Sequence, residues 1–328
     1  EGVEIIVNSE KSASAMGFTE VFGILPQVLG NIRRLLTAVS RKKPDIAILI
    51  DFPDFNFLLM RKLHRQGVKV VYFVPPKVWA WRSSRVKQLA KYTNLRLVLF
   101  PFEPDFYKKH HSSAVYVGHP FLDRPELASK DKLREKYQIQ PAAKVVAFLP
   151  GSRKGEISSL GPVYGEAILQ ISRDIDFIPI VPVADGVDEK ELRELFGVTS
   201  ARVVFIKGQA PEVLALADCA VVASGTATLE AVMAKVPFFV VYKMSKVTFA
   251  LAKRLVKVSS VSMANLLAGR KIVEELLQDQ VTPDAIATRV IRLLSDKNIA
   301  AGLQAEISRA RDLIIKYYHL LETDCAEY

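Results

Sequence analysis

A glycine, a hydroxyl and a guanidinium follow one another directly after an apolar run of this chain. They are Gly151, Ser152 and Arg153, and the run is Lys144–Leu149. A glycine lets backbone approach a ligand closely, and a guanidinium can form paired hydrogen bonds to phosphate oxygens. This turn could therefore bind a phosphate group. An ordinary strand-to-helix turn with an exposed arginine is the simpler alternative.

A second turn of small and hydroxylated residues follows the apolar run Ala220–Ala223. At the start of a helix, such residues leave backbone N–H groups free to bind an anion. Glu230, further along the same helix, could hold a ribose diol or simply complement the helix dipole. The two turns together predict a nucleotide-diphosphate pocket, and neither contains the GxxxxGKS or GxGxxG pattern of ATPases and dinucleotide-binding proteins. The contributing residues of the second turn are expected to be Ser224, Gly225, Thr226 and Thr228.

Titratable side chains also follow the apolar runs of the first half. Asp51 comes directly after the run Asp45–Ile50, and a carboxyl group beside aromatic residues can have a raised pKa and act as a base. Asp54 lies nearer the next helix, and we predict that it caps that helix. His119 ends the last run of this half, where a structural and a catalytic role are both open. The base could therefore be Asp51, Asp54 or His119.

Both tryptophans of the chain lie in a single loop. Trp79 and Trp81 follow the apolar run Val68–Val74, and the same loop carries Lys77 and Arg82. The neighbouring prolines and charges argue against burial of both indole rings. The loop is therefore a second candidate for substrate contact in the first half.

The candidate residues described above can act together only in a fold that brings the ends of its strands together. The alternation of short apolar runs with helical stretches indicates such a fold. Apolar strands separated by helices are typical of parallel sheets covered on both faces, in which ligands bind at the carboxyl ends of the strands. A polar linker, Leu127–Ala143, separates two such series. We therefore predict an α/β fold of two doubly wound, Rossmann-like domains facing across a cleft, with domains at residues 1–140 and 141–300 and a helical tail at 301–328. The remaining predicted strands are Leu95–Phe100, Ala114–Val117, Phe177–Val181, Val203–Ile206 and Phe238–Tyr242.

The net charge of +10 belongs to the first half of the chain. Residues 1–140 contain 23 Lys and Arg against 13 Asp and Glu, whereas residues 141–328 contain 22 of each. A basic half favours an anionic partner, such as nucleic acid, lipid headgroups or a phosphorylated substrate. The basic residues accompany no recognisable RNA-binding or DNA-binding module, which disfavours nucleic acid.

Composition narrows the class of protein further. With 50% hydrophobic and 24% charged residues, the chain is globular rather than disordered. Uncharged stretches such as Val21–Ile32 reach only 12 residues, whereas a membrane-spanning helix needs about 20. The acidic start at Glu1 is unlike a signal peptide, and Cys219 and Cys325 form neither a disulfide framework nor a metal site. A reducing cytoplasm is the expected compartment.

In several of these segments the chain resembles lipid-A-disaccharide synthase. The family opens with a strand and a Gly/Ser-rich loop, and this sequence starts downstream of them. The matching segments are Asp51–Asn56, Val78–Arg82, Gly118–His119, Leu149–Arg153, Ser224–Glu230, Val241–Met244, Leu251–Lys257 and Asn265–Arg270. The resemblance implies a GT-B glycosyltransferase that joins UDP-diacylglucosamine to diacylglucosamine 1-phosphate. It would form a β-1,6 disaccharide with inversion, release UDP, and need no cofactor or metal.

The resemblance also implies roles for individual residues. Asp51 would accept the proton of the acceptor's 6-hydroxyl, and Arg153, Ser152 and the turn from Ser224 would stabilise the charge that develops on UDP. Glu230 would hold the uridine ribose, and Asn265 would orient a phosphate or the sugar. Lys207 and Gly208 are expected near the uracil. His119 is kept as a further catalytic candidate.

The segment Met16–Leu36 is apolar in its first two-thirds and basic after them. Because the implied substrates carry acyl chains, we expect this segment to be a largely exposed patch that docks on an anionic membrane and admits those chains. An ordinary core helix is the alternative. The acceptor-binding and membrane-facing residues would be Phe18, Val21, Phe22, Leu25, Leu29, Trp79, Trp81 and Arg82. The protein would then be peripheral on the inner face of the inner membrane, and a homodimer is possible.

Two other functions are compatible with the same residues. A UDP-N-acetylglucosamine 2-epimerase, or another GT-B enzyme, would share the donor turns but would not account for the apolar segment or the Trp79–Trp81 loop. A non-catalytic module could bind UDP-sugar or anionic lipid without transfer.

Overall fold

A computed structural model describes residues 4–7, 20–80, 83–244, 249 and 260–325, with backbone alone for residues 20–25, 200 and 319–325. The chain forms two compact units. The described part of unit 1 ends at His119, and that of unit 2 begins at Pro120. The predicted boundary at residue 140 therefore lies within unit 2, and the C-terminal helix belongs to unit 2 rather than forming a separate tail.

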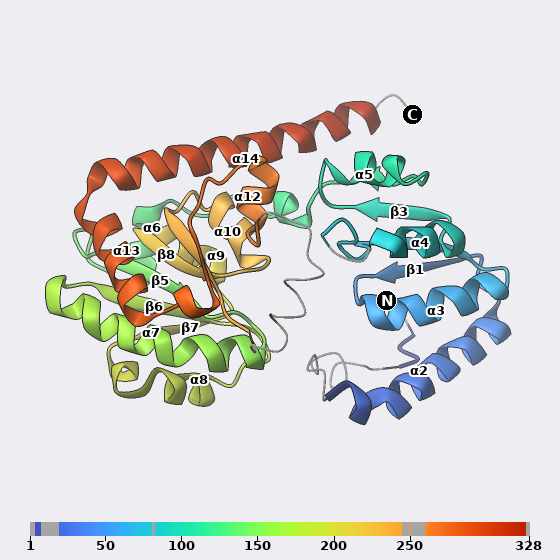
Figure 1. Cartoon of the computed structure of the whole chain (residues 1–328), viewed down its shortest axis with the longest axis horizontal. Coiled ribbons are helices and arrows are strands. Elements are labelled where there is room, and N and C mark those ends of the chain that lie inside the picture. Colours follow the sequence, from blue (N-terminus) through green and yellow to red (C-terminus); the bar gives the residue numbers. More distant parts are fainter. Residues whose placement is uncertain (1–3, 8–19, 81–82, 245–248, 250–259, 326–328) are drawn as a thin grey trace. The chain divides into compact units, whose positions relative to one another are not determined.

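The described residues of unit 1 form a four-stranded parallel sheet with helices between its strands (Figure 1). The strands follow the order β1-β2-β3-β4, so the chain winds in one direction only. The single helix α2 continues through Pro26. The elements are α2 (Glu20–Lys42), β1 (Ile46–Ile50), α3 (Pro53–Arg65), β2 (Lys69–Phe73), η1 (Ser83–Arg85), α4 (Val86–Tyr92), β3 (Leu95–Val98), α5 (Glu103–Lys109) and β4 (Val115–Tyr116).

Only one face of this sheet is covered within the described residues. Alternation along β1 points Leu49 into the core of unit 1, where it joins Met60 of α3 and Tyr72 of β2. On the opposite face of β1, Ile46, Ile48 and Ile50 are 53%, 64% and 59% exposed. Within the described residues of unit 1, no helix packs over these isoleucines.

Unit 2 contains a six-stranded parallel sheet in the order β10-β9-β8-β5-β6-β7. From β5 the chain winds first to one side and then to the other, which is the doubly wound arrangement that the sequence predicted. The elements are η2 (Pro120–Asp123), α6 (Lys130–Lys136), β5 (Val145–Leu149), α7 (Lys154–Asp174), β6 (Ile178–Val183), α8 (Glu189–Phe196), η3 (Gly197–Ala201), β7 (Val204–Lys207), α9 (Ala210–Leu216), β8 (Cys219–Ala223), α10 (Ala227–Met233), β9 (Phe238–Tyr242), α12 (Met263–Ala268), β10 (Glu275–Leu277), η4 (Gln278–Gln280), α13 (Pro283–Ser295) and α14 (Lys297–Cys325).

Helices cover both faces of the unit 2 sheet. Every residue of β5 is buried, with Ala147 facing α6, α9, α10, α12 and α14, and Phe148 facing α7, α8 and α13. Capping side chains begin several of these helices: Asp188 for α8 and Thr282 for α13 accept backbone N–H bonds. Cys219, the first residue of β8, is completely buried in this core.

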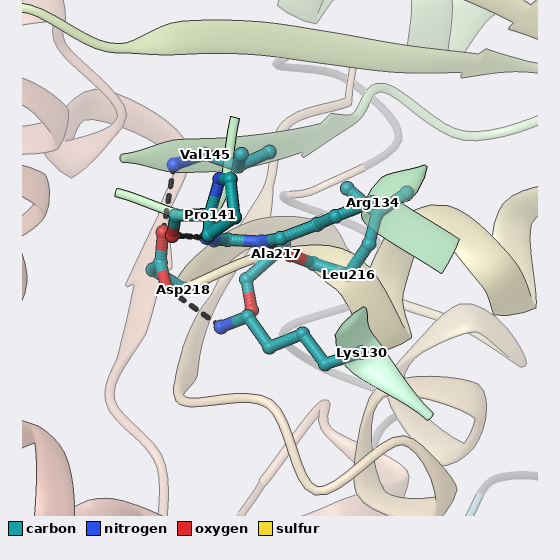
Figure 2. A network of polar contacts seen from close by, with 7 residues as sticks. All are labelled: Lys130, Arg134, Pro141, Val145, Leu216, Ala217 and Asp218. Atoms are coloured by element: carbon teal, nitrogen blue, oxygen red, sulfur yellow. Dashed lines mark hydrogen bonds and ion pairs between the residues drawn. The ribbon is translucent and has the colours of Figure 1, made fainter. Parts of the chain in front are cut away.

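Three charged side chains attach α6 to the sheet of unit 2 (Figure 2). Asp218 Oδ2 accepts from Arg134 Nη2 at 2.9 Å and from the Val145 N–H at 2.8 Å, and its Oδ1 accepts from Lys130 Nζ at 2.6 Å. Arg134 also donates to the carbonyls of Leu216 and Pro141. These bonds join α6, which the sequence assigned to the first domain, to the sheet of unit 2.

Candidate functional site

The two predicted nucleotide turns lie side by side in unit 2. Strand β5 pairs directly with β8, Leu149 opposite Val222, and each turn follows the carboxyl end of its strand. The strand order reverses between β5 and β8, and such a switch point is where doubly wound sheets bind ligands. The structure thus places Gly151–Arg153 and Ser224–Glu230 at the carboxyl ends of two neighbouring strands.

The turn after β5 is organised around a glutamate that the sequence analysis missed. Gly151 has a φ of +99°, and a side chain there would collide with Oε2 of Glu156. Arg153, the residue before α7, lies 3.0 Å from the other carboxylate oxygen of Glu156. The guanidinium is otherwise largely exposed, and Ser152 is exposed beside it. The (i, i+3) spacing of Arg153 and Glu156 was the available sequence signal.

The turn after β8 is held by its own hydroxyl groups. Ser224 Oγ donates to the carbonyl of Val261 at 2.9 Å, and Thr228 Oγ1 donates to the carbonyl of Gly225 at 2.8 Å. Thr228 is completely buried, so its hydroxyl shapes the turn rather than facing a ligand. The Thr226 side chain makes no capping bond, and Gly225 has a φ of +145°. Thr226 and the backbone N–H groups of the turn remain the candidate anion donors.

Glu230 pairs with an arginine from a distant part of the sequence. Arg124 Nη1 lies 3.1 Å from Glu230 Oε1, and the guanidinium stacks 4.1 Å from the centre of the Phe121 ring. Burial raises the pKa of the Glu230 carboxyl above its ordinary value, and the bond from Arg124 partly opposes that rise. Arg124 immediately follows η2, and no local pattern in the sequence indicated it.

Lys207 is the last residue of β7 and Gly208 follows it, on the opposite side of β5 from β8. Two strand spacings separate β7 from β5, which is about 10 Å. A β-carbon on Gly208 would lie 3.7 Å from Asp185 Oδ1, so the loops after β6 and β7 adjoin each other. The predicted uracil contact lies on the same edge of the sheet as the two turns.

Asn265 is buried, and its amide is fully used within the chain. Its Oδ1 accepts from the N–H groups of Ile272 and Val273, and its Nδ2 donates to the Val273 carbonyl and to Glu275 Oε1. Glu275 in turn accepts from the backbone N–H groups of residues 261 and 262. These bonds hold both ends of the Asn265 amide within unit 2, and the contact with phosphate or sugar that the resemblance implied stays a prediction.

In unit 1, Asp51 has an unusual backbone. Asp51 and Phe52 have φ values of 44° and 43°, a region that residues other than glycine rarely adopt and that clusters at functional sites. The Asp51 carbonyl accepts from Asn56 Nδ2 at 2.6 Å and from the Tyr72 hydroxyl at 2.9 Å. These bonds fix the peptide and leave the Asp51 side chain exposed at the carboxyl end of β1.

The predicted capping role of Asp54 is wrong. Pro53 is the first residue of α3, so Phe52 occupies the N-cap position and makes no side-chain capping bond. Asp54 instead lies in the first turn, 83% exposed, with Arg85 Nη2 3.5 Å from its Oδ1. Arg85 also lies 4.7 Å from the centre of the Phe57 ring. Asp54 is thus a second exposed carboxylate near the end of β1.

Trp79 is anchored by a buried carboxylate. Its Nε1 donates to Glu103 Oε1 at 3.0 Å, while Glu103 Oε2 accepts from the N–H groups of Leu99 and Phe100. Burial raises the pKa of the Glu103 carboxyl, and these bonds partly oppose that rise. The centre of the Phe100 ring lies 6.5 Å from that of Trp79 and 6.0 Å from that of His119, so these two predicted residues neighbour the same ring. Trp81 and Arg82 lie outside the described residues.

The predicted membrane segment is only partly described. Phe18 lies outside the described residues, and the described backbone of Val21, Phe22 and Leu25 is helical within α2. Leu29 is 45% exposed, whereas Ile32 is buried in the core of unit 1. The later part of the segment therefore combines an exposed face with a packed one. In the described residues, no helix is long and apolar enough to span a membrane, and no group of three or more His, Cys, Asp and Glu is placed to hold a metal.

Comparison with known proteins identifies the family. The family model described as lipid-A-disaccharide synthetase matches residues 1–319. Lipid-A-disaccharide synthases from Myxococcus xanthus and Koribacter versatilis are 41% and 36% identical to the chain, over 89% and 95% of its length and 77% and 81% of theirs.

Solved structures with low sequence identity share the fold. A UDP-GlcNAc 2-epimerase from Neisseria meningitidis bound to UDP-GlcNAc superposes with a TM-score of 0.58 at 13% identity, over 94% of this chain and 82% of that one. A spinosyn rhamnosyltransferase complexed with thymidine diphosphate also gives 0.58 at 13% identity, over 92% and 79%. These likenesses confirm the GT-B type of fold. With its doubly wound unit 2, its paired turns and close relatives over most of its length, the chain belongs to the lipid-A-disaccharide synthetase family.

Proposed function

We propose that this protein transfers a diacylglucosamine unit from UDP to the 6-hydroxyl of diacylglucosamine 1-phosphate, forming a β-1,6 disaccharide and UDP. Family membership at 35–41% identity supports the reaction. The observation that carries the donor assignment is the pair of turns at the β5–β8 switch point, with Arg153 on one and Glu230 on the other.

Each group in the donor turns suits one part of UDP. Arg153 and the N–H groups at the start of α7 and α10 would bind the diphosphate and stabilise the charge that grows on it as the bond to the sugar breaks. Ionised Glu230 would accept hydrogen bonds from the ribose hydroxyls. The neighbourhood of Lys207 and Gly208 would accommodate the uracil.

The acceptor requires a base. As the 6-oxygen bonds to the anomeric carbon, the bond from that carbon to the diphosphate oxygen breaks, and the proton of the 6-hydroxyl passes to Asp51. The strained backbone of Asp51 supports this choice. Its carbonyl accepts two hydrogen bonds, which fix the backbone position from which the carboxylate extends. Asp54 and His119 are the alternatives that a test must separate.

We also propose that α2 attaches the protein peripherally to the inner face of the inner membrane. Leu29 is exposed, and Arg33 and Arg34 are exposed on the next turn. An exposed apolar side chain followed by two arginines suits the boundary between acyl chains and anionic headgroups. Such a surface would admit the acyl chains of the substrates from the membrane.

The deciding experiment is product analysis with both acylated sugars. Release of UDP together with a disaccharide 1-phosphate, dependent on both substrates, would establish the transfer. Conversion of UDP-N-acetylglucosamine to its 2-epimer would indicate the alternative enzyme. UDP binding without either product would indicate a binding module.

A further inference from the structure

The phosphate turn of unit 2 already contains an anion, the carboxylate of Glu156. Its Oε2 occupies the flank of Gly151 where a side chain would otherwise lie, and its Oε1 pairs with Arg153 at 3.0 Å. Glu156 also lies in the first turn of the 21-residue helix α7, where the helix dipole favours negative charge. One carboxylate thus engages three features that would attract a phosphate group. They are the glycine flank, the guanidinium and the helix N-terminus.

The electrostatics of Tyr242 agree with a position of this carboxylate at the switch-point end of the sheet. Tyr242 is the last residue of β9, and β9 pairs with β8 beside the second turn. Burial raises the pKa of the Tyr242 hydroxyl, the charge of Glu156 raises it further, and Arg153 lowers it. Glu156 and Arg153 therefore both lie near the strand end that flanks the second donor turn.

We propose that Glu156 is an internal competitor of the donor diphosphate. This inference rests on the proposed function for its choice of ligand, a nucleoside diphosphate. The Glu156 carboxylate leaves Gly151 and Arg153 when UDP-sugar binds, and it returns to them when UDP departs. Because a carboxylate and a diphosphate repel each other at short range, both cannot occupy the turn together.

As a competitor, Glu156 affects UDP binding by occupying the turn and Arg153, without itself contacting UDP. In the opposite role, the carboxylate would hold Arg153 in the orientation that binds phosphate, and its removal would weaken UDP binding. The two roles predict opposite signs for the same substitution. The sign of the affinity change therefore decides between them.

The experiment is calorimetric titration of wild-type protein and Glu156→Gln with UDP, uridine and inorganic pyrophosphate. Glutamine keeps the size of the side chain and removes its charge. Glu166→Gln is the matched control, because Glu166 is exposed on the same helix about 15 Å further along and its substitution changes the net charge equally.

Glu156→Gln should bind UDP about 3- to 10-fold more tightly than wild type, with a gain that shrinks at high salt. Uridine affinity should stay constant, and Glu166→Gln should behave as wild type. Weaker or unchanged UDP binding in Glu156→Gln would overturn the proposal.

Failure of the proposed function gives a separate result. If the wild type binds no UDP, the donor assignment fails, and pyrophosphate then tests Glu156 alone. Tighter pyrophosphate binding by Glu156→Gln would support competition for the turn regardless of the nucleotide, whereas unchanged or absent binding in both proteins would overturn it.

Discussion

The guanidinium of Arg124 and the carboxylate of Glu230 lie 3.1 Å apart, although 106 residues separate them in the sequence. The ion pair affects the pKa of the Glu230 carboxyl, which we expect to hold the ribose. Because Arg124 opposes the rise in the Glu230 pKa, its removal should raise that pKa further.

The first prediction concerns UDP affinity and its dependence on pH. Arg153→Ala and Glu230→Ala should each weaken UDP binding by about 10- to 100-fold, because each loses a charge-assisted hydrogen bond. In the wild type, affinity should fall as the pH drops through the raised pKa of Glu230. Arg124→Ala should move that fall to higher pH. Calorimetric titration over a pH series measures both effects.

Arg193→Ala is the control for the Arg124 variant. Arg193 pairs with Glu189 at 2.8 Å and lies 4.2 Å from the centre of the Phe205 ring, so its removal deletes an equivalent set of contacts elsewhere in unit 2. A pH profile shifted equally by both variants would argue against Glu230 as the ribose ligand.

The second prediction concerns the base. Asp51→Asn should lower turnover by about 10²- to 10⁴-fold and leave UDP affinity unchanged, because only proton transfer is lost. Asp54→Asn is the matched comparison, since it removes another exposed carboxylate three residues away. Steady-state turnover of the three proteins identifies the base. More than half of wild-type turnover in Asp51→Asn would transfer the role to Asp54 or, if that variant is also active, to His119.

The third prediction concerns the buried carboxylate of Glu103 and the stability of unit 1. Because burial raises its pKa in the folded state, the unfolded chain loses this proton at lower pH than the folded protein does. Stability should therefore fall as the pH rises from the ordinary glutamate pKa through the raised one. Denaturant titrations at several pH values, compared with Glu103→Gln, isolate this contribution.

Trp79→Phe provides a second arm for this test. It removes the indole N–H that lowers the Glu103 pKa, so the stability loss should extend to higher pH than in the wild type. Glu103→Gln should itself cost about 1–3 kcal/mol, because an amide cannot satisfy all three N–H donors. Identical pH dependence in wild type and Glu103→Gln would refute the titration of Glu103 in this range.

The fourth prediction concerns the attachment of α6. Asp218→Ala should lower the free energy of unfolding of unit 2 by about 2–4 kcal/mol, because it leaves the buried Arg134 without a counter-ion. Asp312→Ala, which removes an exposed carboxylate of α14, should change stability little. Chemical denaturation measures both, and equal stability of the two variants would show that the Asp218 carboxylate does not contribute to holding α6.

The fifth prediction concerns α2. Replacing Val21, Phe22, Leu25 and Leu29 with Ser should reduce co-sedimentation with anionic vesicles and increase solubility, without the loss of about 2–5 kcal/mol per site that core positions would show. Leu169→Ser, at a 39% exposed leucine of α7, is the control for loss of a surface apolar group. Unfolding of the fourfold variant would assign these residues to the core and end the membrane proposal.

Local patterns were sufficient for the framework of unit 2 and for its two turns. The apolar run at β5 predicted a strand, and the small residues after β8 predicted the start of a helix. Both features depend on residues that are adjacent in the sequence. Strand β10 escaped prediction, since it has only three residues and begins with Glu275. Its identity depends on pairing with β9 rather than on its own composition.

The predictions that failed or were missing depend on distant contacts or on backbone detail. Arg124 is defined by Glu230, and the placement of residues 120–140 is defined by Asp218, neither of which is near in sequence. The capping role given to Asp54 failed because α3 begins at Pro53, two residues earlier than the capping pattern assumed. The exposed isoleucines of β1 have the same apolar sequence as a covered strand, so composition could not distinguish the two.

The buried position of Cys219 allows opening of unit 2 to be measured by labelling of its thiol. This thiol lies completely inside the sheet of unit 2, and burial raises its pKa, so neither thiolate nor access is available to a labelling reagent in the closed state. In a Cys325→Ser background it is the one thiol of the chain. Its labelling rate then measures how often the central strands separate, and a ligand that binds only the closed unit slows that rate in proportion to its occupancy.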